Sequence, residues 1–155
     1  MATTAILQVF DSYGAPKLQG SSSITDHSDW LELMSWTFGQ GDARPIDGKI
    51  KDFNFTARID AHLAGFIGEA VARGFHFEKA TALMYQITDT SRDWYLQFDM
   101  SVPTFTSFNP TPDTGTVTIL FEIVTITYRK AATVQSELGG SDPNSWSYDS
   151  SLSSG

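Results

Sequence analysis

Hydrophobic and polar residues alternate along much of this chain, which is the pattern of β-strands that bury one face. The alternation is cleanest over Lys51–Ile59, where the aromatic and aliphatic positions are expected to face inward and the polar positions outward. We predict strands over five further segments, which are Ala5–Phe10, Trp30–Phe38, Phe75–Ile87, Trp94–Phe108 and Val117–Arg129. The segments between them are rich in Gly, Pro, Ser and Asp, as loops are.

The second of these segments is unusually aromatic. Strict alternation places Trp30, Met34, Trp36 and Phe38 on one face. It places Leu31, Leu33, Ser35 and Thr37 on the other, so that this second face changes from apolar to polar along the strand.

A single helix is predicted after the third strand. Asp60 is a suitable N-cap, and Gly74 suits the left-handed position that ends a helix. The apolar residues between them recur at helical spacing over about three turns. So short a stripe is stable only when it packs against a sheet, and the chain therefore reads as a mainly β domain, barrel or sandwich, with one helix.

Composition narrows the function classes. The 155 residues include eleven Phe, five Tyr and four Trp but no Cys, which excludes disulfide scaffolds, zinc–thiolate sites and cysteine nucleophiles. A net charge of −8 disfavours binding to nucleic acid or to anionic lipid. No apolar run reaches the roughly 20 residues of a membrane span, and Met1–Phe10 does not resemble a signal peptide, so we expect neither.

Candidate catalytic chemistry is sparse. The histidines His27, His62 and His76 form no metal-ligand spacing, so we expect no metal and no cofactor. Glu32 and Glu122 could flank a cleft as an acid–base pair, which is the enzymatic alternative.

A second alternative is a carbohydrate-binding β-sandwich, with Trp30, Trp36 and Phe38 as a sugar-stacking platform. More commonly such aromatic faces form a core or a subunit interface. The chain has more apolar face than one small barrel needs, which favours association with other chains. The pattern therefore indicates a β-rich, associating protein that is not an enzyme, with no catalytic residues.

Several motifs in order resemble the Hcp family, the haemolysin-coregulated tube proteins of bacterial type VI secretion systems. The segment from His27 to Gly39, HSDWLELMSWTFG, is similar to the family signature. The segment KDFNFT from Lys51 resembles a conserved strand, and SWSYD from Ser145 resembles the family's terminal aromatic segment.

The resemblance implies a compact β-barrel of two sheets with one flanking helix. Six copies would close into a homohexameric ring, and stacked rings would form a tube that can carry effectors. The implied partners are contractile sheath proteins, the spike tip protein and the baseplate. The protein would assemble in the bacterial cytoplasm and then be secreted without a signal peptide. A tube protein of a related phage-tail-like injection system is the alternative within this fold.

Residue roles follow from the resemblance as expectations. Residues 1–130 would form the Hcp-like barrel, and the Ser-rich residues 131–155 a tail that docks through Trp146 and Tyr148. Ser35 and Thr37 would face the lumen, with Trp36 and Phe38 pointing into the core. The ring-stacking loop would contribute Gln40, Asp42, Arg44, Asp47 and Lys49.

Overall fold

The computed structural model describes residues 2–20, 22, 24, 27–39, 52–88, 92–129 and 145–149. Its strands are β1 (Ala2–Phe10), β2 (Leu31–Phe38), β3 (Asp52–Arg58), β4 (Lys79–Ile87), β5 (Arg92–Ser101), β6 (Thr104–Pro110), β7 (Thr114–Leu120), β8 (Val124–Arg129) and β9 (Ser145–Asp149). One helix, α1 (Ala61–Arg73), lies between β3 and β4. The mainly β class with a single flanking helix is thus confirmed.

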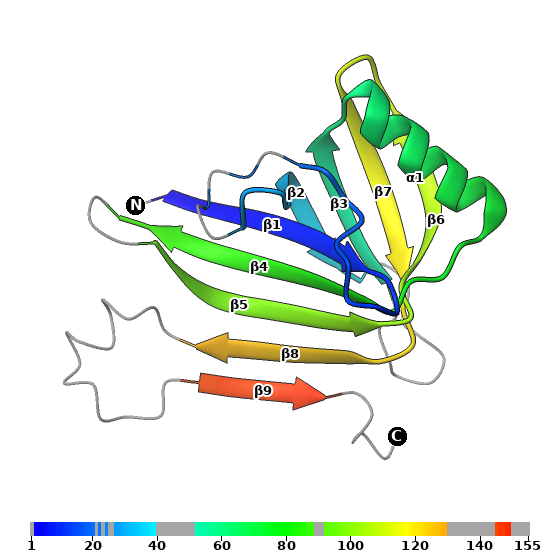
Figure 1. The fold of residues 1–155 in the computed structure, drawn as a ribbon. Helices are drawn as coiled ribbons and strands as arrows, with labels where there is room; N and C mark the ends of the chain where they lie inside the picture. The colour runs from blue at the N-terminus through cyan, green and yellow to red at the C-terminus, as the bar shows by residue number, and fades with distance from the viewer. Residues whose placement is uncertain are drawn as a thin grey trace.

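All nine strands belong to one antiparallel sheet, in the order β6-β7-β3-β2-β1-β4-β5-β8-β9. Figure 1 shows that the sheet curves, with β4, β5, β8 and β9 forming one wing and β3, β7 and β6 the other. The predicted pair of sheets is therefore one continuous sheet, in which β6 and β9 are the outermost strands. Among the described residues no pairing between β6 and β9 closes it into a barrel.

The helix forms where the sequence predicts it. The Asp60 carboxylate accepts a hydrogen bond from the Leu63 backbone N–H at 2.8 Å, which caps the first turn. Gly74 ends the helix in the left-handed conformation, with φ of 65°. Leu63, Ile67 and Ala70 are buried, and α1 packs against β6, as Figure 1 shows.

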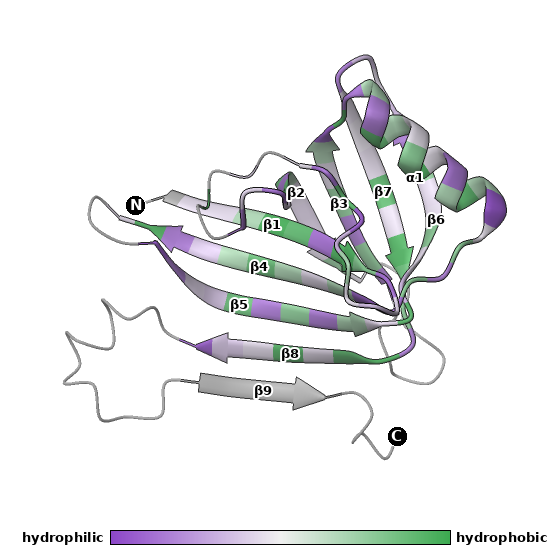
Figure 2. Cartoon of the chain, viewed as in Figure 1, coloured by the Kyte–Doolittle hydropathy of each residue, from purple (hydrophilic) through white to green (hydrophobic). Residues whose placement is uncertain are grey.

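The main core lies between the curved sheet and α1. Its largest fully buried side chains include Phe53, Phe55 and Phe105. Phe98 of β5 contacts Trp36, Phe38 and Phe53 across the core, with ring centroids 5.1–5.7 Å apart. The alternation that produces this core is visible along β7 as green and pale bands (Figure 2).

A second, smaller cluster covers the opposite face of β1 and β4. Ile6, Leu83 and Tyr85 lie there with Ile24 from the long connection between β1 and β2, and Trp30 and Trp94 pack around them. Arg129 stacks on the Trp94 ring, with its guanidinium carbon 3.7 Å from the ring centroid. Both faces of the central strands are consequently buried.

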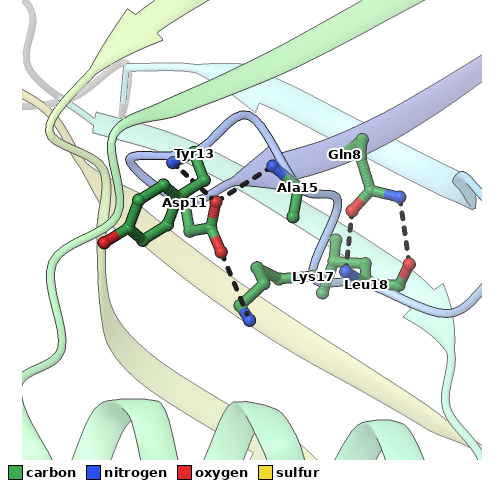
Figure 3. Close-up of polar contacts among 6 residues, drawn as sticks. All are labelled: Gln8, Asp11, Tyr13, Ala15, Lys17 and Leu18. Carbon is green, nitrogen blue, oxygen red and sulfur yellow. Dashed lines mark hydrogen bonds and ion pairs between the residues drawn. The ribbon is translucent and has the colours of Figure 1, made fainter.

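Gln8 holds the β1–β2 connection in place. This side chain is fully buried, and its Oε1 accepts a hydrogen bond from the Leu18 backbone N–H at 2.7 Å. Its Nε2 donates to the Leu18 carbonyl at 3.0 Å, so both ends of the amide are satisfied (Figure 3).

Candidate assembly surfaces

A β-bulge decides which residues of β2 reach the core. Leu33 pairs with Ala57 of β3, but Ser35 pairs with Thr56, so Met34 is the additional residue. Before the bulge Leu31 and Leu33 are buried. After it, Trp36 and Phe38 pack against the core, and this part of the prediction is confirmed.

The strict alternation predicted for this segment is therefore wrong. Met34 is 56% exposed and does not share a face with Trp36. Trp30 belongs to the second cluster, on the other side of the sheet. Trp30, Trp36 and Phe38 consequently do not form the shared platform that carbohydrate stacking would require.

Ser35 and Thr37 are exposed, and they begin a polar surface that crosses four strands. Residues paired across adjacent antiparallel strands share a face of the sheet. The register therefore defines two rows, which are Ser35–Thr56–Thr116–Asn109 and Thr37–Asn54–Thr118–Ser107. We call these eight residues the polar face. All eight side chains end in a hydroxyl or an amide, and none is charged.

Four side chains of the polar face hydrogen-bond to one another or to Asp52. The hydroxyls of Thr56 and Thr116 lie 3.1 Å apart, and the Thr118 hydroxyl donates to the Asn54 carbonyl oxygen at 2.6 Å. Asn54 in turn donates to the Asp52 carboxylate at 2.9 Å. The eight side chains can all hydrogen-bond to water and carry no charge, although the chain has 18 acidic residues.

Ser35 and Thr37 were predicted to lie on such a face, and the alternation in β3 predicted that its polar residues point outward, but the β6 and β7 members were missed. The signal was present, because TGTVT at the start of β7 alternates small polar and buried residues as β3 does. What the sequence lacked was the register that places β7 beside β3.

A cleft of about 690 Å³ opens between β2, the end of β3 and the start of α1. Its apolar lining comes from Leu31, Leu33, Met34, Ile59 and Leu63. Its charged lining comes from Glu32, Asp60 and Asp113, with Arg58 as the one cation among the described lining residues. We call this site the acidic cleft.

The turn after β1 presents an aromatic ring to solvent. Tyr13 is 93% exposed. Asp11 fixes the turn, because its Oδ1 accepts hydrogen bonds from the backbone N–H groups of Tyr13 and Ala15, each at 2.9 Å (Figure 3). Lys17 Nζ lies 3.6 Å from the other carboxylate oxygen.

These contacts change the acidity of Asp11. The hydrogen bond from the Ala15 backbone is the largest cause that lowers the pKa of Asp11 below its ordinary value of 3.8, with smaller contributions from Tyr13 and Lys17. Gly14 completes the turn with φ of 78°, a conformation that side chains other than glycine rarely adopt. The turn is thus held by the chain's own backbone and one carboxylate.

The structure tests little of what was predicted for two groups of assembly residues. The loop residues Gln40, Asp42, Arg44, Asp47 and Lys49 lie outside the described residues. The segment with Trp146 and Tyr148 forms β9, whose backbone pairs with β8 at Tyr128↔Trp146 and Ile126↔Tyr148. Docking of these two side chains stays a prediction.

The enzymatic alternative finds no geometric support. Glu32 lines the acidic cleft, whereas Glu122 lies between β7 and β8 and is not part of that lining. Over the described residues, no group of three or more His, Asp or Glu side chains could hold a metal ion. No helix in that same part of the chain is long and apolar enough to cross a membrane.

The single curved antiparallel sheet with one packed helix defines a mainly β protein, and one of its exposed faces is uncharged and polar. Comparison with solved structures finds the same fold in several secretion proteins. Hcp1 from E. coli EAEC 042 superposes with a TM-score of 0.69 at 20% identity, covering 95% of this chain and 98% of that one. Hcp1 from Salmonella typhimurium gives 0.66 at 19% identity, with 83% and 86% covered.

The secreted protein Hcp3 from Pseudomonas aeruginosa gives a TM-score of 0.68 at 12% identity, covering 96% of this chain and 98% of that one. A search of the curated proteins returned no significant match. The family model described as "Type VI secretion system effector, Hcp" matches residues 9–133. The chain therefore belongs to the Hcp family of type VI secretion proteins.

Proposed function

We propose that this chain is the structural subunit of the inner tube of a type VI secretion system, and that six copies form each ring of that tube. The observation that carries the proposal is the polar face. Eight uncharged polar side chains on four adjacent strands form a surface that belongs to neither the core nor a catalytic site. Such a surface suits the wall of a water-filled lumen. Ser35 and Thr37 would then line the lumen.

For a ring of six copies, the dimensions of the polar face give a wide hole. Four strands from each of six copies give 24 strands around the lumen. At a strand spacing of about 4.8 Å the circumference is about 115 Å, which corresponds to a diameter of about 37 Å, and tilting the strands widens it further. A hole of this size admits small folded proteins, so effector cargo is part of the proposal.

The remaining assembly roles extend this proposal. The loop with Gln40, Asp42, Arg44, Asp47 and Lys49 would connect stacked rings, and Trp146 and Tyr148 would dock on a neighbouring subunit. The outer surface of the tube would meet the contractile sheath, and its ends the spike tip protein and the baseplate. Assembly in the bacterial cytoplasm would precede secretion.

Electron microscopy and native mass measurement of the purified protein test the proposal. We expect six-fold rings with a hole of roughly 40 Å across, as the strand arithmetic gives. A protein that remains strictly monomeric at high concentration would overturn it. Deleting residues 41–47 should leave single rings but weaken their stacking, and long tubes formed by that deletion variant would remove the loop from the proposal.

A further inference from the structure

The polar face carries no charge, although other parts of the same sheet do. A surface with an ordinary share of charged residues, roughly a quarter to a third, would place about two or three charges among the eight positions of the polar face. In the other wing, the row Thr81–Asp99–Thr125 includes a carboxylate, and Lys79 pairs with Ser101 in the neighbouring row. The absence of charge is therefore a property of the polar face and not of the sheet as a whole.

Charged side chains flank the polar face at the two ends of β3. The alternation along this strand places Asp52 just before Asn54 and Arg58 just after Thr56, so the two flanking charges have opposite signs. The Asp52 carboxylate accepts a hydrogen bond from the neutral Asn54 amide at 2.9 Å. Glu32 lies at the other end, where it lines the acidic cleft together with Arg58. Between these ends the eight residues present only hydroxyl and amide dipoles.

We propose that the polar face gives the lumen wall a nearly neutral electrostatic potential, so that the tube accepts cargo proteins of either charge. This inference rests on the proposed function, because the polar face must line a lumen. A ring of six copies carries an excess of about 48 negative charges, since each copy has a net charge of −8. Charges farther away than about 8 Å are largely screened at physiological ionic strength, so the nearest groups set the potential at the wall. A charged wall would instead attract cargo of one sign and repel cargo of the other.

Thiol labelling of assembled rings measures this potential, because the chain has no cysteine of its own. Ser35→Cys and Ser107→Cys each place one thiol at an exposed position, on β2 and on β6. The rates of reaction with a cationic and an anionic methanethiosulfonate reagent are compared with those of free 2-mercaptoethanol. The ratio of the two rates cancels differences in thiol exposure and acidity, and a potential of one kT changes it by about sevenfold. We expect both sites to lie within about threefold of the free thiol, at low and at high salt.

Two control variants show what a charged environment does to the ratio. Ser28→Cys places the thiol beside the exposed Asp29 and should favour the cationic reagent at low salt. Thr118→Asp, combined with Ser107→Cys, places a carboxylate directly opposite the thiol and should raise the preference for the cationic reagent by at least about threefold.

The outcomes separate the inference from the proposed function. A ratio outside the expected range at position 35 or 107 of intact rings would overturn the inference and leave the proposed function standing. An unchanged ratio in the double variant would also overturn the inference, because the wall's own groups would then not set the potential. A wild-type protein that forms no rings would overturn the proposed function itself.

Discussion

The Gln8→Leu variant tests whether one buried amide holds the β1–β2 connection. Leucine is close to glutamine in size, so the change removes the polar atoms with little change in volume. The Leu18 backbone N–H and carbonyl then lose their partners at 2.7 and 3.0 Å. Leu18 is 2% exposed, so water does not replace these hydrogen bonds.

The expected loss follows from these two groups. A buried donor or acceptor left without a partner costs about 1–3 kcal/mol, so two cost about 2–6 kcal/mol. Burying an apolar side chain in place of an amide raises the free energy of unfolding by about 1–2 kcal/mol. Taking the middle of each range, we expect the free energy of unfolding to fall by about 2.5 kcal/mol, which lowers Tm by about 5–10 °C for a chain of this size.

Chemical and thermal unfolding followed by circular dichroism at one fixed protein concentration measures this loss, since assembly would otherwise shift the apparent stability. Gln19→Leu is the matched control, because Gln19 is an exposed residue of the same connection and should change stability by less than about 0.5 kcal/mol. A Gln8→Leu variant whose free energy of unfolding lies within about 0.5 kcal/mol of the wild type would show that the buried amide does not hold the connection.

Three further predictions concern single residues. A Cβ on Gly20 would lie 2.3 Å from the Trp30 carbonyl oxygen, so Gly20→Ala should destabilise the fold by about 1–3 kcal/mol. Gly65→Ala, at a position where nothing lies within 4 Å, should instead stabilise α1 by about 0.5–1 kcal/mol. Urea unfolding measures both variants, and equal changes in their free energies of unfolding would refute the predicted difference. Asp60→Ala removes the cap of α1 and should cost about 1 kcal/mol by the same measurement; an unchanged midpoint would exclude capping. The pKa of Asp11 is lowered in the folded chain. Its contribution to stability is therefore complete above the unfolded pKa of 3.8 and is lost as the pH falls through the lower folded pKa. An NMR titration of Asp11 with a midpoint at or above 3.8 would contradict this prediction.

The sequence was sufficient for the elements with strong local signals. Asp60 and Gly74 marked the ends of α1 because capping is encoded within a single turn. The alternation in β3 identified Phe53 and Phe55 as core residues. These signals depend on neighbours in the chain, and reading along the chain finds them.

The remaining errors come from local breaks in regular backbone. Val117–Arg129 reads as one strand, but Phe121–Ile123 separate β7 from β8, and the two strands lie in different wings of the sheet. Trp94–Phe108 likewise divides at Val102, whose φ of 47° is unusual for a β-branched residue, and at Pro103, where proline predicts a bend or an edge. Such breaks keep the hydrophobic pattern nearly continuous, so periodicity does not reveal them.

The same limit applies to the candidate site. The family resemblance, and not the periodicity, placed Ser35 and Thr37 away from the core, and they are exposed. The bulge at Met34 was not predicted, since an additional residue in one strand is defined only by the partner strand. The acidic cleft depends on how distant segments meet, which one sequence does not encode in a readable form.

The pairing of β3 with β7 has a consequence for how this chain reaches its native state. Asp52 lies opposite Leu120, with α1 and three other strands between them in the sequence. Proteins whose contacts join such distant segments fold slowly, because a long loop must close before the contact forms. During synthesis the edge of β3 is therefore exposed until residues near 120 have left the ribosome. We expect copies of this chain to need protection from premature edge-to-edge pairing in that interval.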